Sequence, residues 1–227
     1  MASLLPSITN MKKSLVKLTL DLSNMPLISD STLSHLFYAL TELTGLLSLD
    51  LNLNYCNVIS DEGLEDLAIG IGGLVMLNSL NIDLGNCQMV NKNGFRHVAM
   101  ALRNLVALKK LQLIFVGHYY IDDILIEALS SNLSHLQKLT SLSLNFSYCS
   151  HITDGGVECL ISHIKCIEIL EELRFLFVNC FSVSMSQIKR TKMVFAQAGK
   201  MTHFCLDYKG CQRINRLFQY CSKNYLH

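Results

Sequence analysis

A thiol, an imidazole and a carboxylate lie within six residues of one another at Cys149, His151 and Asp154. A nucleophilic cysteine reacts as its thiolate, which a neighbouring imidazole can generate while a carboxylate orients the ring. The stretch could therefore be a cysteine-type active site. The decision depends on the elements that carry the three residues, and on whether similar residues recur elsewhere in the chain.

The pattern L-x-x-L-x-L-x-L recurs along the chain at a constant spacing of 31 residues. Its first residues, which we call the anchors of units one to seven, are Leu15, Leu46, Leu77, Leu108, Leu139, Leu170 and, in weaker form, Met201. The apolar residues that follow each anchor alternate with polar ones, which predicts a strand with one buried face. A fixed period of this length indicates a solenoid built from repeated supersecondary units.

A turn and an amphipathic helix follow each predicted strand. Each turn ends in a helix-capping residue, and these are Ser29, Ser60, Asn91, Asp122, Thr153 and Ser184. Asp30, Asp61, Asp123 and Asp154 come next, where a carboxylate faces the positive end of a helix. Leu64, Leu67, Ile71 and Leu74 illustrate the helical spacing of the apolar residues.

Stacked units of this kind bury their apolar sides against one another in one continuous core. We therefore predict an α/β solenoid, a curved horseshoe with a parallel β-sheet inside and α-helices outside. It has about seven 31-residue repeats, over residues 15–227, after a short N-terminal cap at residues 1–14. In the last unit we expect a short helix over Asn215–Tyr220.

The repeat gives the cysteines a common position, ten residues after each anchor. This position holds Met25, Cys56, Cys87, His118, Cys149, Cys180 and Cys211. A reactive cysteine would occur once in a special setting, so Cys56, Cys87, Cys149, Cys180 and Cys211 are interpreted as a structural thiol column. Zinc needs ligands that converge at about 2.0–2.3 Å, whereas neighbouring rungs point in parallel at roughly 4.8 Å steps. We expect no metal, no cofactor and no catalytic residue.

His118 interrupts the thiol column within V-G-H-Y-Y. Two interpretations are open: a histidine whose hydrogen bonds are satisfied in a variant turn, or a unit that presents Tyr119 and Tyr120 as a rim contact. Tyrosine is enriched where protein interfaces form.

The unit resembles a leucine-rich repeat, and its turn resembles the cysteine-containing class, as in C-N-V-I-S-D-E-G-L-E-D-L from Cys56 and C-S-H-I-T-D-G-G-V-E-C-L from Cys149. The units here are longer than those of the family. The resemblance implies a protein-binding solenoid, often the substrate-binding half of an F-box ubiquitin-ligase adaptor. Because 14 residues precede the first strand, we expect no F-box here, so that such an adaptor would need a separate F-box partner.

Composition narrows the function classes. The net charge of +1 gives no general attraction to nucleic acid or to an acidic membrane. The sequence has no apolar run long enough for a membrane span and no phosphate-loop, G-x-S-x-G or H-E-x-x-H motif. We expect a cytoplasmic protein with reduced thiols, no enzymatic activity and no small-molecule substrate. Charged residues make up only 16%, which suggests that neighbouring proteins cover part of the surface.

The concave face of the sheet is the remaining candidate site. Most of its side chains are short and polar, whereas units four and six carry Ile114, Val116, Leu176 and Val178. We predict a partner-binding surface formed by these four residues with Asn145, Glu172, Arg174, His203 and Asp207. The alternative is that the C-terminal segment folds back over the apolar residues.

These observations predict a non-catalytic protein–protein interaction module, a structural subunit or scaffold with several protein partners in one assembly. We place it in the cytoplasm, with the cytoskeleton as one place of association. The second hypothesis is the ubiquitin-ligase adaptor implied by the family resemblance.

Overall fold

The computed structural model describes residues 14–25, 28–196 and 201–211, which form seven strands and six helices in strict alternation. The strands are β1 (Lys17–Asp21), β2 (Ser48–Asn52), β3 (Ser79–Asp83), β4 (Lys110–Ile114), β5 (Ser141–Asn145), β6 (Glu172–Leu176) and β7 (His203–Asp207). The helices are α2 (Asp30–Leu40), α3 (Asp61–Gly72), α4 (Lys92–Leu102), α5 (Asp123–Leu133), α6 (Asp154–Ile164) and α7 (Met185–Ala196). The predicted N-terminal cap (apart from Ser14) and the predicted helix Asn215–Tyr220 lie outside the described residues.

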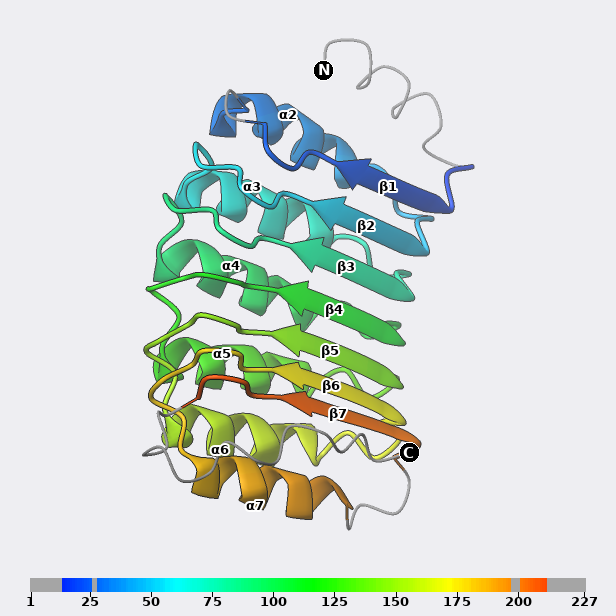
Figure 1. The fold of residues 1–227 in the computed structure, drawn as a ribbon. Coiled ribbons are helices and arrows are strands. Elements are labelled where there is room, and N and C mark those ends of the chain that lie inside the picture. The colour runs from blue at the N-terminus through cyan, green and yellow to red at the C-terminus, as the bar shows by residue number, and fades with distance from the viewer. Residues whose placement is uncertain (1–13, 26–27, 197–200, 212–227) are drawn as a thin grey trace.

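The strands form one parallel sheet in chain order, with the helices in a second layer behind it (Figure 1). Every residue of β1 to β6 pairs with the residue 31 positions later, as Leu49 does with Leu80 and Leu80 with Leu111. The strand leucines point into the layer between sheet and helices, and Leu80 is 1% exposed. The predicted α/β leucine-rich-repeat solenoid is confirmed.

A ladder of backbone hydrogen bonds continues from the sheet into the turns. The residue seven positions after an anchor donates its backbone amide to a carbonyl of the next unit. Phe115 donates to Asn145 in this way, and Phe146 donates to Leu176. Phe115, Phe146 and Phe177 stack along this position with ring centroids 5.8 Å apart at each step. We call this side of the molecule, where strands end and helices begin, the turn edge.

The aspartates at the starts of four helices join their units to the next one. Asp30 accepts hydrogen bonds from the amide and hydroxyl of Ser60, and Asp123 does the same for Thr153. Asp61 and Asp154 make the corresponding bonds to the amides of Asn91 and Ser184, at 2.7 and 2.6 Å. The sequence suggested a role at the helix end, and the structure adds this link between units.

At three joints the aspartate leaves no room for a side chain on the next helix, and glycine stands there. A side chain at Gly63, Gly94 or Gly156 would collide with the carboxylate of Asp30, Asp61 or Asp123, respectively. At the next joint Gln187 occupies the equivalent place beside Asp154, so a longer side chain can be accommodated there.

The joint between units three and four is built differently. Lys92 stands where four other units have the aspartate, and the capping residue opposite it is Asp122 rather than serine, threonine or asparagine. The lysine ammonium and the Asp122 carboxylate lie 3.7 Å apart as an ion pair. The charged partners have exchanged sides, and Leu125 takes the place that glycine holds in its neighbours.

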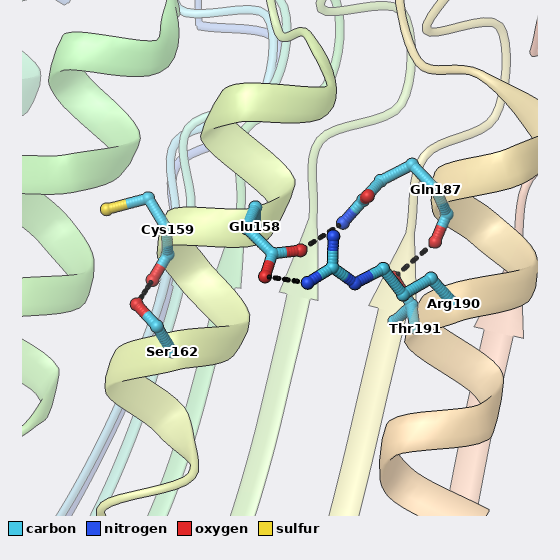
Figure 2. Close-up of polar contacts among 6 residues, drawn as sticks. All are labelled: Glu158, Cys159, Ser162, Gln187, Arg190 and Thr191. Atoms are coloured by element: carbon cyan, nitrogen blue, oxygen red, sulfur yellow. Dashed lines mark hydrogen bonds and ion pairs between the residues drawn. The ribbon is translucent and has the colours of Figure 1, made fainter.

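The joint between α6 and α7 carries additional polar contacts, which Figure 2 shows. Glu158 accepts a hydrogen bond from the side-chain amide of Gln187 at 3.0 Å and pairs with Arg190 at 3.0 Å. These contacts attach the last described helix to the preceding unit.

Helix capping agrees with the sequence at most positions. The side chains of Ser60, Asp122 and Thr153 accept a hydrogen bond from an amide of the first helical turn. Ser29 makes no such bond, and its hydroxyl instead lies within hydrogen-bond distance of the hydroxyls of Ser31 and Thr32. Asn91 also makes no side-chain capping bond.

Candidate functional site

Cys149, His151 and Asp154 do not face one another. The Cys149 thiol donates to the carbonyl of Phe115 at 3.1 Å, and burial raises its pKa to about 12. His151 is exposed and packs edge to face on the ring of Tyr119, at 4.2 Å between centroids. Asp154 accepts from the amide of Ser184. The three side chains have three separate partners, and the thiol remains protonated at neutral pH.

The column to which Cys149 belongs repeats one hydrogen bond. The buried thiols of Cys56, Cys87, Cys149, Cys180 and Cys211 each donate to the carbonyl 34 residues earlier, at sulfur–oxygen distances of 2.7–3.1 Å. Burial raises the pKa of all five thiols, to about 12 for Cys87 and about 11 for Cys211. Each thiol therefore satisfies a buried carbonyl of the preceding turn.

His118 makes the same bond with an imidazole. Its Nε2 lies 2.6 Å from the carbonyl oxygen of Leu84, again 34 residues earlier, and it is 2% exposed. Because a carbonyl oxygen can only accept, Nε2 carries the hydrogen. The ring packs edge to face on Phe95 at 4.5 Å, and burial lowers the pKa of the imidazole. His118 is a neutral, satisfied member of the column.

No group of three or more histidine, cysteine or carboxylate side chains within the described residues is arranged to hold a metal ion. The nearest approach to a reactive constellation is Cys159 and His163 on α6, with Sγ 3.7 Å from Nδ1. That nitrogen lies closer to the Cys159 carbonyl, at 2.9 Å, so it carries a hydrogen and cannot accept the thiol proton.

The predicted partner-binding residues lie on the sheet in two groups. The register places Ile114, Asn145, Leu176 and Asp207 side by side across β4 to β7. Glu172, Arg174 and His203 are exposed on β6 and β7. The sheet register places Glu172 beside His203 on the neighbouring strand.

The apolar side chains of this surface are half-buried rather than exposed. Ile114 and Val116 form one strip, and Leu176 and Val178 form another. Asn145 and Ser147 of unit five lie between the strips, because the register places that unit between units four and six. The candidate site is therefore two apolar strips with a polar row between them.

A turn motif that the sequence interpretation missed explains many of the polar residues on this face. Six residues after the anchor, an aspartate or asparagine accepts a hydrogen bond from the backbone amide two residues further on. The acceptors are Asp21, Asn52, Asp83, Asn145 and Asp207, at 2.8–3.2 Å. Asn145 and Asp207, which we predicted as binding residues, thus also hold their own turns. Aspartate or asparagine recurs six residues after the anchor, and this recurrence in the sequence could have revealed the Asx turn.

Units four and six lack the motif. Ile114 and Leu176 stand at the acceptor position and have no oxygen to offer the amides of Val116 and Val178. These two units therefore have an apolar side chain on the concave face in place of a hydrogen bond that stabilises the turn in five other units.

Tyr119 and Tyr120, the predicted rim contact, lie at the turn edge of unit four. Both rings are exposed and meet edge to face at 5.6 Å between centroids. They follow the turn after β4, beyond the apolar strips along the chain, and we consider them separately below.

No protein-family model and no curated protein matches the chain. Among solved structures, actin-binding site 2 of leiomodin-1 is similar with a TM-score of 0.53 and 15% identity, over 86% of this chain and 94% of that one. The tropomodulin C-terminal domain of Caenorhabditis elegans has a TM-score of 0.47 and 12% identity, over 87% and 92%. A chain of the yeast Rad7–Elc1 complex has a TM-score of 0.34 and 14% identity, over 92% and 63%.

The leiomodin-1 likeness agrees with the geometry described above and shows a shared fold, the leucine-rich-repeat type of α/β solenoid. In the described part of the chain, no helix has the length and apolar character that a membrane crossing requires.

Proposed function

We propose that this chain is a non-catalytic protein–protein interaction module, and that the two apolar strips on its concave face bind the partner. Glu172, Arg174 and His203 at the exposed end of the sheet would supply the polar margin of the interface. We further propose that the chain serves as a structural subunit or scaffold in a larger assembly.

The replacement of the Asx turn in units four and six carries this proposal. A turn hydrogen bond contributes about 1 kcal/mol, and five units keep it. Units four and six lack this hydrogen bond, because Ile114 and Leu176 stand at the acceptor position. Both residues place branched side chains on the solvent side of the sheet. An apolar residue that weakens its own turn and does not complete the core is best explained by contact with another molecule.

The test restores the missing motif. Ile114→Asn combined with Leu176→Asn should rebuild two Asx turns and change the free energy of unfolding by no more than about 1 kcal/mol, because the new hydrogen bonds offset the lost apolar contact. Partner recovery should fall sharply, as measured by affinity purification from the native source followed by mass spectrometry. Chemical denaturation of the same protein checks the fold.

Ser79→Asn is the matched control, because Ser79 is a half-buried residue on the concave side of β3 and lies at the opposite end of the strand from the residue that pairs with Ile114. It should leave partner recovery unchanged. If the double variant is stable and recovers the same proteins as wild type, the concave strips are not the binding surface.

Association with the cytoskeleton is the finer part of the proposal. The leiomodin-1 domain that shares this fold is described as an actin-binding site, which makes actin a specific partner to test. Co-sedimentation of the purified chain with filamentous actin, compared with the Ile114→Asn/Leu176→Asn variant, would test it. Nothing in the structure favours the ubiquitin-ligase adaptor over this function.

A further inference from the structure

A second surface on the turn edge stands out because its aromatic side chains are exposed. We define the aromatic rim as Tyr119, Tyr120, Tyr148, His151 and Phe181, from units four, five and six. The loops that carry them lie side by side, joined by bonds from the Gly117 amide to Ser147 and from the Tyr148 amide to Val178. Two edge-to-face contacts, from Tyr119 to Tyr120 and to His151, fix the rings at the centre.

Tyr148 occupies a backbone conformation that most units of this fold give to asparagine or glycine. The position before the thiol column is left-handed in all seven units. Five of them use asparagine or glycine, and the other two use Tyr148 and, outside the rim, Tyr55. Tyr148 adopts a φ of 65° there, a conformation that bulky side chains rarely take. Its ring is 56% exposed, so packing in the core does not offset the backbone strain.

The charges of the turn edge indicate which partner would fit the rings. From the last strand residue to the first helical turn, aspartates occur in six of the seven units, with Asp122, Asp123 and Asp154 in units four and five. In the described part of this region the lysines are Lys92, which is paired with Asp122, and Lys209. The carboxylates outnumber the lysines, although the partial positive charge at each helix start offsets part of their effect.

We propose that the aromatic rim binds a basic segment of a partner protein, with lysine or arginine side chains over the tyrosine rings. The face of a tyrosine ring attracts a cation, and the neighbouring aspartates add longer-range attraction. This surface goes beyond the concave site, lies on a different side of the molecule and could act without it.

Direct peptide binding tests the proposal. The probes are fluorescein-labelled peptides of alternating lysine and serine, glutamate and serine, and proline and serine, measured by fluorescence anisotropy on the full chain. Only the lysine peptide should bind. Tyr119→Ser combined with Tyr148→Asn should weaken its binding about tenfold, since two cation–π contacts are lost.

Two controls separate the possible explanations. Tyr38→Ser removes a tyrosine that is 70% exposed on α2 and should leave binding unchanged. Tyr148→Asn alone should not lower the melting temperature, because it installs the residue used by Asn24, Asn86 and Asn179. The concave variant Ile114→Asn/Leu176→Asn should keep full peptide binding, so failure of one surface would not imply failure of the other.

Three results would overturn the proposal. The first is lysine-peptide binding that is insensitive to the tyrosine substitutions, which would mean that the carboxylates alone attract the peptide. The second is equal or stronger binding of the glutamate or proline peptide. The third is a lower melting temperature of Tyr148→Asn, because the tyrosine would then be needed for folding.

Discussion

At the residue scale, the thiol column shows how a small donor can serve each turn of a solenoid. Each thiol reaches a carbonyl in the preceding turn and fills little space. The carbonyls of Phe115, Phe146 and Phe177 are among the acceptors, so the hydrogen bonds also hold the stacked rings in register. His118 makes the same bond with a larger group, which the edge of Phe95 accommodates.

The raised thiol pKa values predict alkaline sensitivity. In the unfolded chain a thiol ionises near 9.0, whereas in the folded chain Cys149 ionises at about 12. Between these values the folded state holds more protons, so stability falls as pH rises and is fully present below about pH 9. Each buried thiol should contribute a loss of about 1.4 kcal/mol per pH unit in this range.

Urea denaturation at a series of alkaline pH values would measure this loss. Cys149→Ala should show a smaller decrease with pH than wild type, by the share of one thiol, although it is less stable at neutral pH. A free energy of unfolding that stays constant above pH 9 would contradict the assignment of these thiols as buried and protonated.

At the scale of elements, polar contacts at the helix starts stabilise the joints between units. Most joints use an aspartate that accepts from the next cap, and the joint between α4 and α5 uses Lys92 and Asp122 instead. Both arrangements place one carboxylate at the joint, contributed by the earlier unit in the first case and by the later unit in the second.

The exchanged pair can be tested with a double-mutant cycle. Lys92→Asp alone should cost about 1 kcal/mol or more, because it sets a second carboxylate against Asp122. Adding Asp122→Ser should recover much of that loss by creating the aspartate–serine joint seen between Asp154 and Ser184, where Gln187 occupies the place that Leu125 has in unit four. Equilibrium denaturation of the four proteins gives the coupling energy. A double variant as unstable as the sum of its single changes would rule out this compensation.

The sequence predicted the elements far better than the joints. The 31-residue period placed every described strand and the apolar face of every helix, because both depend on periodic burial. It did not reveal that Asp123 accepts from Thr153 or that Asp83 holds its own turn, since an aspartate looks alike in either role. For the candidate site, Ile114 and Leu176 were found by their apolar character, but the missing hydrogen bond needed the turn geometry.

At the scale of the whole molecule, each unit packs only on its neighbours, yet they share one core. Buried leucines run without interruption from Leu20 in unit one to Leu173 in unit six. A change in the middle of such a stack therefore affects both halves.

Leu80→Asp tests this dependence. Leu80 is the second residue of β3 and is 1% exposed, so the substitution buries an unpaired carboxylate at a cost of several kcal/mol. We expect loss of the cooperative unfolding transition in circular dichroism. Ser79→Asp, on the concave side of the same strand, should fold normally. A cooperative Leu80→Asp protein would show that the inward register of β3 is wrong.

The exchanged charges at Lys92 and Asp122 also determine which repeat units could replace one another in the stack. Units two and five both begin their helix with an aspartate and cap it with serine or threonine, so either one could stack in the other's place. The joint between units three and four is the exception, since a unit four placed after any unit with an aspartate at this position would set Asp122 against another carboxylate. Duplication or recombination of single units could therefore lengthen this chain at most joints, while the pair formed by units three and four would have to move together.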